Sequence, residues 1–467
     1  MPTVAAVLEY AAAHSQRFTA ELSELLKIPS ISTMPEHAPD VEQAAQWLVD
    51  NMQQMGITTQ IYQQAGYLPL VYGEWNGAGP GAATVLLYCH YDVQPAFLSD
   101  GWDTDPFTPT EKDGRIYARG AVDSKGHVMA NLKAIESMLM VDAACPVNLK
   151  ILFEGEEESG SEHIFQFVAD HASMLQADVC VVSDGSMPDT HQPVLDYGLR
   201  GIITFEVEVT GPRRDLHSGH YGGNVHNPIQ ALAEILAQLH DADGHVTVPG
   251  FYEDVQPLST EEHETLARII DLMEHEWHEV TGAPAYWGEP EYLLHERVGV
   301  RPTLEINGIA GGYYGEGFKT VIPSKALAKV SCRLVPNQDP DKIFALVSDY
   351  LHALTPPTVT LDIRMVEEGS PGIVLDRHSP AMRAVFNAYQ AAWGGVPRYS
   401  RAGGSIPVVS AFQAKLSMPI VLMPYGYKGC GAHSINEHVY IDMFHKGIAT
   451  AIHFYHEFAS MHDSATT

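Results

Sequence analysis

The feature that most constrains the fold is a set of three short apolar runs, each followed directly by acidic or histidine residues. The runs span residues 83–88, 147–153 and 179–182, and helix-length patterns at about 125–141 and 162–171 separate them. Short continuous apolar runs that alternate with helices are typical of strands buried in a parallel sheet. This pattern predicts an α/β sheet covered by helices.

Polar side chains follow each of these predicted strands. His90 and Asp92 come after the first strand, three glutamates at 156–158 after the second, and Asp184 after the third. Ligands of open α/β sheets bind beyond the carboxyl ends of the strands. We therefore expect these side chains to converge on one crevice.

The pattern changes near Tyr197, which indicates a second unit. Downstream, the periodicity predicts strands at 202–209, 326–335 and 359–366, helices at 228–239 and 341–354, and one further strand at about 308–314. This order resembles a β-α-β-β-α-β unit. A length of 467 residues also favours two domains over a single core.

We accordingly predict a catalytic domain in two parts, residues 1–198 and 379–467, with a ferredoxin-like α+β domain inserted at 199–378. Helix patterns at 4–27 and 41–55 begin the catalytic domain, and patterns for a helix at 380–393, a strand at 419–423 and a helix at 441–458 complete it. Residues 241–300 are expected to form a helical or loop insertion, to which the sequence gives no clearer role.

Composition argues against several classes of partner. The chain has 27 basic and 58 acidic residues, a net charge of −31 that repels nucleic-acid phosphates and anionic lipids. No run approaches the roughly 20 apolar residues of a membrane span, and the N-terminus lacks a secretory signal pattern. The five cysteines are scattered, which argues against a disulfide framework or a thiolate zinc site. We expect a cytoplasmic protein that binds neither nucleic acid nor membranes.

Five segments carry residues that suit metal chemistry. Each segment alone is explained as well by a polar strand end, a helix N-cap or a solvated loop. Together they supply two histidines and several acids, the nitrogen and oxygen donors that Zn²⁺ or Mn²⁺ accepts. Consecutive glutamates in a crevice are costly unless cations neutralise them. The candidate residues are His90, Asp92, Asp123, Glu156, Glu157, Glu158, Asp184 and His433.

The order of these segments resembles the M20 metallopeptidases, particularly the carnosinase-like cytosolic dipeptidases. The matching motifs are HYDVQP at 90–95, RGAVDSKG at 119–126, EGEEESGS at 154–161, SD at 183–184 and GAHSINE at 431–437. The inserted domain adds DLHSG at 215–219, KTVIP at 319–323 and RLVP at 333–336. The resemblance spans Leu87 to Glu437 and implies a metallopeptidase fold with a lid and dimerisation domain.

The resemblance also implies a site for two divalent ions, Zn²⁺ or Mn²⁺. Asp123 would bridge the ions, with His90 and Asp184 completing one coordination sphere and Glu158 and His433 the other. A carboxylate has two oxygens and can hold ions about 3.5–4 Å apart.

The same resemblance assigns roles to neighbouring acids. Asp92 would orient His90 through its ring N–H. Glu157 would be the general base that takes a proton from the metal-bridging water and passes one to the leaving amine. Glu156 stands where relatives carry an apolar residue, but the register against the following Ser-Gly-Ser favours Glu157 as base and Glu158 as ligand.

Further residues would act on the substrate. His217 would reach from the inserted domain of a partner subunit in a homodimer and stabilise the oxyanion. Thr320, Arg333 and Ser405 would bind the substrate carboxylate, a role that the planar fork of arginine suits. Without the resemblance, His217 would be read as a surface-loop histidine and Arg333 as part of a structural salt bridge.

One position departs from the family pattern next to the bridging acid. Ser124 follows Asp123 where relatives commonly carry Asn or Asp. The family often has a cis peptide bond at this point, and we expect one here.

The leading hypothesis is hydrolysis of dipeptides or short peptides with a free C-terminal carboxylate. An alternative within the family is an N-acyl-amino-acid deacylase or desuccinylase. A non-catalytic metal-dependent binding protein is a third reading, against which the presence of Glu157 and Asp92 argues. A serine hydrolase is disfavoured because no GxSxG motif is present. The sequence leaves open the physiological substrate, the choice between Zn²⁺ and Mn²⁺, and the position of the lid.

Overall fold

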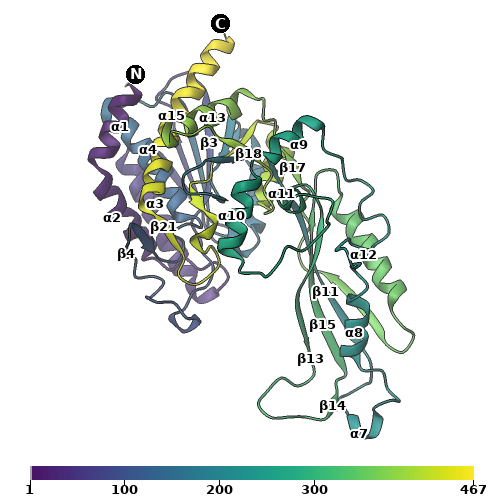
Figure 1. Cartoon of the computed structure of the whole chain (residues 1–467). Coiled ribbons are helices and arrows are strands. Elements are labelled where there is room, and N and C mark those ends of the chain that lie inside the picture. The colour runs from purple at the N-terminus through teal and green to yellow at the C-terminus, as the bar shows by residue number, and fades with distance from the viewer. Residues whose placement is uncertain (1–2, 467) are drawn as a thin grey trace.

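A computed structural model describes residues 3–466 as a larger lobe that holds both ends of the chain and a smaller, elongated lobe that extends from it (Figure 1). The larger lobe is built on a six-stranded sheet of order β1-β2-β6-β3-β7-β19. Strands β6, β3, β7 and β19 are parallel, whereas β1 and β2 are antiparallel at one edge. The bounds are β1 Thr58–Tyr62, β2 Leu70–Trp75, β3 Thr84–His90, β6 Asn148–Glu154, β7 Val179–Val182 and β19 Ile420–Leu422.

Helices cover both faces of this sheet. On one face α4 packs against α1, α2 and α15, and α15 packs against α13, whereas α14 packs against α5. Within residues 3–466, no helix is both long and apolar enough to cross a bilayer. The helices are α1 Val4–Ala13, α2 Ser15–Leu26, α3 Ala38–Gln54, α4 Lys125–Asp142, α5 Glu162–Asp170, α6 Ala172–Leu175, α13 Pro380–Trp393, α14 Pro407–Leu416 and α15 Ile441–Thr466.

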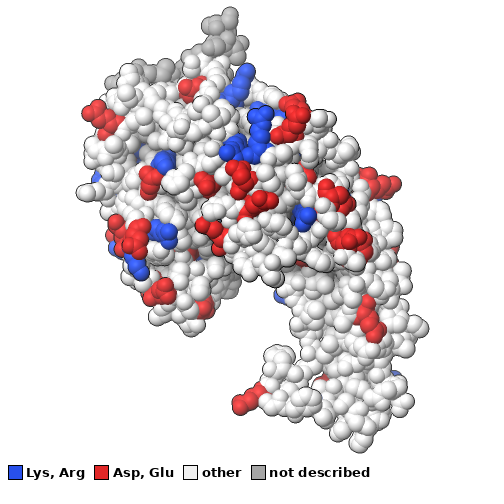
Figure 2. Space-filling view, in the orientation of Figure 1, with Lys and Arg blue, Asp and Glu red and all other residues white. Residues whose placement is uncertain are grey.

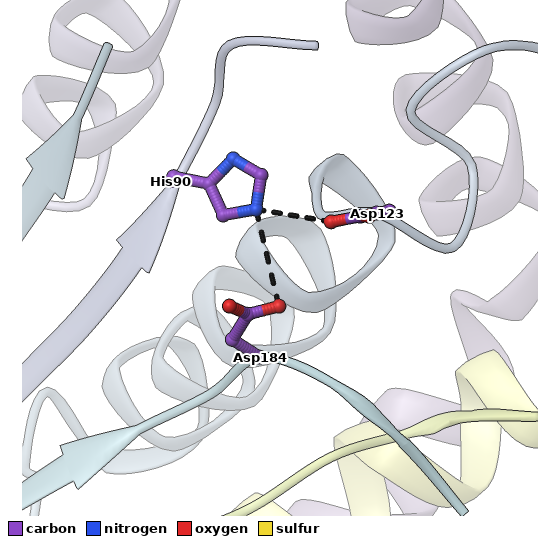
Figure 3. Close-up of side chains that lie close together, drawn as sticks. All are labelled: His90, Asp123 and Asp184. Atoms are coloured by element: carbon purple, nitrogen blue, oxygen red, sulfur yellow. Dashed lines mark hydrogen bonds and ion pairs between the residues drawn. The ribbon is translucent and has the colours of Figure 1, made fainter. Parts of the chain in front are cut away.

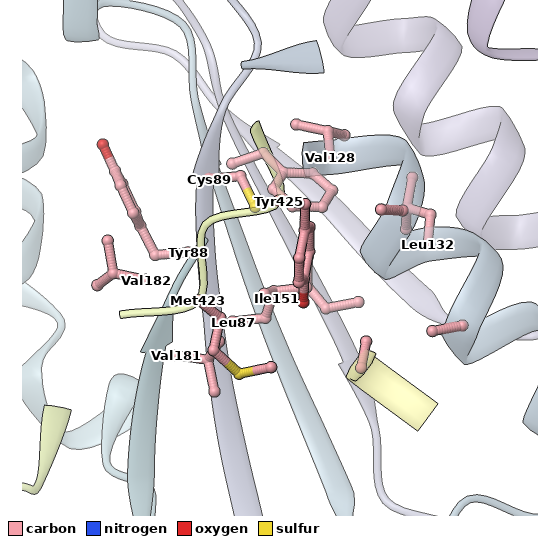
Figure 4. Packing of buried hydrophobic residues seen from close by; sticks show 14 of the residues in the cluster. Leu87, Tyr88, Cys89, Val128, Leu132, Ile151, Val181, Val182, Met423 and Tyr425 are labelled. Carbon is pink, nitrogen blue, oxygen red and sulfur yellow. The ribbon is translucent and has the colours of Figure 1, made fainter. Parts of the chain in front are cut away.

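Packing around β3 explains why its sequence is continuously apolar. Successive side chains of a strand point to opposite faces, so a strand covered on both sides buries every one. Cys89 faces α4, where its sulfur lies 3.9 Å from the Asn131 amide nitrogen, and Figure 4 shows Val128 on the same side. Tyr88 points the other way and meets the Phe412 ring of α14 edge-on at 5.5 Å. The predicted sheet with helices on both faces is therefore confirmed.

The smaller lobe contains a four-stranded antiparallel sheet of order β13-β15-β11-β16. Helices α8 and α12 pack on this sheet and share with it a separate apolar core. The chain order is β-α-β-β-α-β, which confirms the predicted ferredoxin-like unit. The bounds are β11 Gly201–Thr210, α8 Pro228–Leu236, β13 Thr303–Gly311, β15 Lys325–Leu334, α12 Pro340–Leu354 and β16 Thr360–Met365.

The insertion at 241–300 contains three helices and lies against the larger lobe. Ile269, Met273 and Val194 form its small buried cluster. The prediction of a helical or loop insertion is thus confirmed. Its helices are α9 Thr260–Ala267, α10 Ile270–Val280 and α11 Leu294–Gly299.

Short elements connect these main parts. They are the strands β4 Thr110–Lys112, β5 Arg115–Tyr117, β8 Ser186–Met187, β9 Val194–Asp196, β10 Gly198–Leu199, β12 Leu216–His217, β14 Val321–Ile322, β17 Ile373–Val374, β18 Arg398–Ser400, β20 Gly426–Tyr427 and β21 His438–Tyr440, helix α7 Ser218–Tyr221, and the 3₁₀ helices η1 Pro35–His37, η2 Leu98–Asp100, η3 Glu157–Ser159 and η4 Lys428–Cys430.

Several local predictions differ from the structure. The helix pattern at 4–27 is divided at His14, whose backbone leaves the helical region. Strand β13 begins at Thr303 rather than near residue 308, because its pairing with β15 starts earlier and continues through a register shift after Ile306. Strands β1 and β2 and helix α14 were not predicted. Strand β1 is partly exposed and lacks the continuous apolar run that marked the central strands.

Candidate active site

The predicted ligands His90, Asp123 and Asp184 meet beyond the carboxyl ends of the sheet strands. His90 ends β3, Asp184 follows β7, and Asp123 lies in the loop before α4. The His90 Nε2 atom lies 3.1 Å from Asp123 Oδ1 and 3.9 Å from Asp184 Oδ1 (Figure 3). The peptide bond between Asp123 and Ser124 is cis, as expected. The strand ends thus bring three separate sequence motifs into one donor group.

Asp123 also belongs to a second donor group. Its Oδ2 atom lies 3.0 Å from His433 Nε2, which lies 3.2 Å from Glu158 Oε2. Within each group the potential ligand atoms lie within 4.8 Å of one another. A carboxylate shared by two such groups is suited to hold two cations side by side.

The chemistry of these groups indicates that they require positive charge. Glu158 has a buried Oε1 atom without a hydrogen-bond partner among the described residues. His433 Nε2 donates hydrogen bonds to the Asp123 and Glu158 carboxylates, and these bonds raise the pKa of His433 to about 10. Burial raises the pKa of Asp184 to about 6, and Asp123 contributes to the rise. Imidazoles and carboxylates in this arrangement fit divalent cations such as Zn²⁺ or Mn²⁺.

Asp92 connects His90 to the glutamate turn. Its Oδ1 atom lies 3.3 Å from His90 Nδ1, on the side of the ring away from Asp123. The same carboxylate accepts the backbone N–H groups of Glu157 at 3.2 Å and Glu158 at 3.0 Å. A hydrogen bond at Nδ1 leaves Nε2 available as a metal ligand. Asp92 is fully buried, so it can fix both the His90 ring and the turn.

Two neighbouring glutamates of the turn point in different directions. The Glu156 carboxylate accepts the Leu68 backbone N–H at 2.8 Å. The Glu157 side chain instead lines a cavity of about 550 Å³, together with Asp123 and Asp184. Burial raises the pKa of Glu157 well above its usual range, and the charge of Asp184 adds to the rise. A raised pKa suits a carboxylate that exchanges protons near neutral pH.

Glu437 anchors the loop that carries Asp123 and was not assigned a role from the sequence. Its carboxylate accepts the backbone N–H groups of Gly120, Val122 and Asp123 at 2.9–3.0 Å. The Arg119 guanidinium donates to the same carboxylate at 2.7 Å. The signals in the sequence were its place at the end of the GAHSINE motif and its position four residues after the predicted histidine ligand. Glu437 therefore links the loop that carries Asp123, the ligand shared by both groups, to the loop that carries His433, a ligand of the second group.

A cationic group faces the cavity from another side. Arg333 Nη1 donates to Ser405 Oγ at 2.7 Å, and Ser405 lines the cavity. Burial and the neighbouring Arg333 lower the pKa of Arg200, which also lines the cavity, to about 10. The structure thus brings Arg333 and Ser405 together as predicted, beside a further arginine that the sequence did not single out.

Thr320 and His217 are not among the residues that line this cavity. The Thr320 carbonyl accepts the Ser218 backbone N–H at 3.1 Å, and His217 pairs with Val321 between β12 and β14. Both residues are exposed, and Figure 1 places β14 and helix α7, which follows His217, at the far end of the smaller lobe. The expected grouping of Thr320 with Arg333 is therefore not formed within one chain, because strand pairing holds Thr320 beside His217.

Comparison with known proteins identifies the family to which this geometry belongs. The profile of peptidase family M20/M25/M40 matches residues 86–457. The chain belongs to the M20/M25/M40 peptidase family. The resemblance inferred from the motifs is confirmed, and with it the prediction of a metal-dependent peptidase.

Relatives in this family match over nearly the whole chain. The Cys-Gly metallodipeptidase of Schizosaccharomyces pombe is 36% identical over 464 residues, covering 95% of this chain and 96% of its own length. The human Beta-Ala-His dipeptidase is 31% identical over 474 residues, with 98% and 93% covered. The crystal structure of human carnosine dipeptidase 1 superposes with a TM-score of 0.88 at 31% identity, covering 98% of this chain and 99% of that one. The predicted fold class is confirmed.

Proposed function

We propose that this M20 peptidase hydrolyses dipeptides that carry a free C-terminal carboxylate. The observation that carries the proposal is the position of Asp123, shared by two donor groups in the same cavity that Glu157 lines. The full-length relatives are dipeptidases by name. For that reason the deacylase alternative and the binding-protein alternative are not favoured.

Two divalent cations are proposed as cofactors, either Zn²⁺ or Mn²⁺. His90 and Asp184 would hold one cation with Asp123, and Glu158 and His433 would hold the other with the same aspartate. Cations bound there would polarise the scissile carbonyl group and lower the pKa of a water molecule towards neutrality.

The protein groups would then move protons and orient the substrate. Glu157 would accept a proton from the attacking water and deliver one to the amine nitrogen as the C–N bond breaks. Asp92 would keep His90 Nδ1 protonated and hold the turn that carries Glu157. Arg333 and Ser405 would bind the substrate carboxylate and so fix the position of the scissile bond.

We further propose a homodimer in which His217 and Thr320 of one subunit complete the site of the other. These residues lie exposed at the tip of the smaller lobe, and the loop between β13 and β14 exposes 93% of Tyr314 and 92% of Phe318. Large aromatic residues with this exposure are typical of interaction surfaces. Figure 2 shows the molecule hollowed between the two lobes, where a second copy could be received.

We propose a cytoplasmic location because the cysteines form no disulfide bonds. All five are free and buried. Structural disulfides are common in secreted proteins and rare in the cytosol.

The decisive experiment for the proposed activity is amine release by chelator-stripped protein after addition of Zn²⁺ or Mn²⁺. The substrates are a panel of dipeptides and a matched panel of N-acyl amino acids. Restored cleavage of dipeptides alone supports the dipeptidase. Cleavage of acyl amino acids alone would replace it by the deacylase, and inactivity with both panels would favour a binding protein.

Replacing Arg333 by alanine is expected to lower kcat/KM for dipeptides about ten- to hundredfold, mainly through KM, because a charged hydrogen bond to the substrate is lost. The same variant should cleave the corresponding dipeptide amides as well as the wild type does. The measurement is steady-state kinetics on each dipeptide and its amide. Arg364→Ala is the matched control, since Arg364 is an exposed arginine of the same lobe paired with Glu206. An equal loss on both substrates would contradict carboxylate binding by Arg333.

Replacing His217 by alanine is expected to lower kcat about 10²–10³-fold without loss of metal, because a donor to the oxyanion is removed. His352→Ala, an exposed histidine of the same lobe, should leave kcat unchanged. The measurement is kcat together with metal content.

Mixing subunits tests whether His217 acts on the partner's site. In a heterodimer of His217→Ala and Glu157→Gln subunits, one site would receive both intact residues, so activity should return on mixing. No return of activity in mixtures shown to contain heterodimers would mean that His217 does not act across subunits.

A further inference from the structure

The insertion at 241–300 supplies one wall of the active-site cavity. Met273, Glu276 and Trp277 of α10 line the cavity that also contains Asp123 and Glu157. Glu276 and Trp277 follow Met273 by three and four residues, so both lie on the same side of the helix as Met273. One face of α10 therefore forms part of the cavity wall, beside Leu294 and Val298 of α11.

Charges are separated along this cavity. Arg333 and Arg200 gather near Ser405, where the substrate carboxylate would bind. Asp196 and Glu276 define an acidic end of the cavity near η4, because both line the cavity, Asp196 is attracted to Lys428 of η4, and α10, which carries Glu276, packs against η4. A zwitterionic dipeptide with its carboxylate at the arginines would direct its N-terminal residue towards the acidic end.

Glu276 is the acid at this end without a cationic partner. Burial raises the pKa of Asp196 to about 6, and the Lys428 ammonium opposes the rise, so these two charges offset each other. The next acid along α10, Glu279, accepts the Tyr427 hydroxyl at 2.9 Å. Among the ion pairs found within residues 3–466, none includes Glu276. Its carboxylate is therefore available to a substrate.

Trp277 gives this wall a second means of attracting a cation. Its indole is only partly buried, and it meets the Tyr286 ring edge-on at 4.5 Å. Indole faces attract ammonium and guanidinium groups within about 6 Å. A carboxylate and an indole on adjacent positions of one helix face form a suitable environment for a cationic side chain.

We infer that Glu276 and Trp277 form a subsite that selects dipeptides whose N-terminal residue has a cationic side chain. The inference rests on the proposed dipeptidase activity and names its preferred substrate class.

The test compares lysylglycine with norleucylglycine, which has a similar chain length and lacks the side-chain ammonium group. We expect the wild type to favour lysylglycine about fivefold in kcat/KM, as for a partly exposed ion pair. Glu276→Gln should abolish this preference while keeping kcat/KM for norleucylglycine. Trp277→Leu should reduce the preference about two- to fivefold.

Glu274→Gln is the matched control, because Glu274 is an exposed acid of the same helix outside the cavity lining. It should retain the preference of the wild type. An unchanged preference in Glu276→Gln, or no preference in the wild type, would refute the subsite and leave the dipeptidase activity intact. Failure of the wild type to cleave either dipeptide would instead refute the proposed function and the subsite together.

Discussion

Replacing Glu157 by glutamine is expected to lower kcat about 10²–10⁴-fold, because glutamine cannot accept the proton of the attacking water. The substitution preserves size, and the hydrogen bonds that this turn donates to Asp92 come from its backbone N–H groups rather than from the changed side chain. Metal content and melting temperature should therefore stay near the wild-type values. The measurements are kcat on a dipeptide, bound metal per subunit and thermal unfolding.

Glu156→Gln is the matched control for this prediction. Glu156 adjoins Glu157 in sequence, but its carboxylate accepts the Leu68 backbone N–H, a role that an amide oxygen can also fill. Its kcat should stay close to that of the wild type. A large loss in Glu156→Gln with little loss in Glu157→Gln would show that the base had been assigned to the wrong glutamate.

Replacing Glu437 by glutamine is expected to weaken metal affinity about 10–100-fold, as is typical when a group that supports a ligand is removed. The carboxylate accepts four donors with two oxygens, whereas an amide has one oxygen and turns its NH₂ group towards N–H donors. The Asp123 loop should therefore lose its fixed position. The measurement is competition for metal with a chelator of known affinity.

A variant of a second buried glutamate serves as the control. It distinguishes a loss of metal affinity from a general loss of stability. Glu289 is buried and accepts two hydrogen bonds from Arg301, whereas the buried Glu437 accepts one from Arg119. Glu289→Gln should lower the melting temperature without changing metal affinity. If Glu437→Gln lowers only the melting temperature and binds metal like the wild type, Glu437 has no role in positioning Asp123.

Much of the central sheet could be predicted from the sequence, because its central strands are covered on both faces. Burial on two faces favours apolar residues at successive positions, and the largely apolar runs at β3, β6 and β7 are visible without a structure. Strand β1 was missed because it is half exposed and its residues alternate only weakly. Its place at the antiparallel edge depends on pairing with β2, which local composition does not encode.

Parts of the candidate site could also be predicted from the sequence. His90 ends the buried strand β3 and Asp184 lies two residues after β7, and strand ends of one parallel sheet meet at one edge. Their residue types limit the chemistry to nitrogen and oxygen ligands. The motif order then predicted the family, which the comparisons confirm.

The sequence by itself determined the parallel strands β3, β6, β7 and β19 of the central sheet, the family and the types of ligand, because these depend on local patterning and on motifs in a fixed order. Tertiary structure decided that the Glu157 side chain, rather than that of Glu156, enters the cavity, since Asp92 holds the turn. It also decided that Glu437 supports the Asp123 loop and that Thr320 lies with His217. These features depend on contacts between segments far apart in the chain, whose distances no local pattern contains.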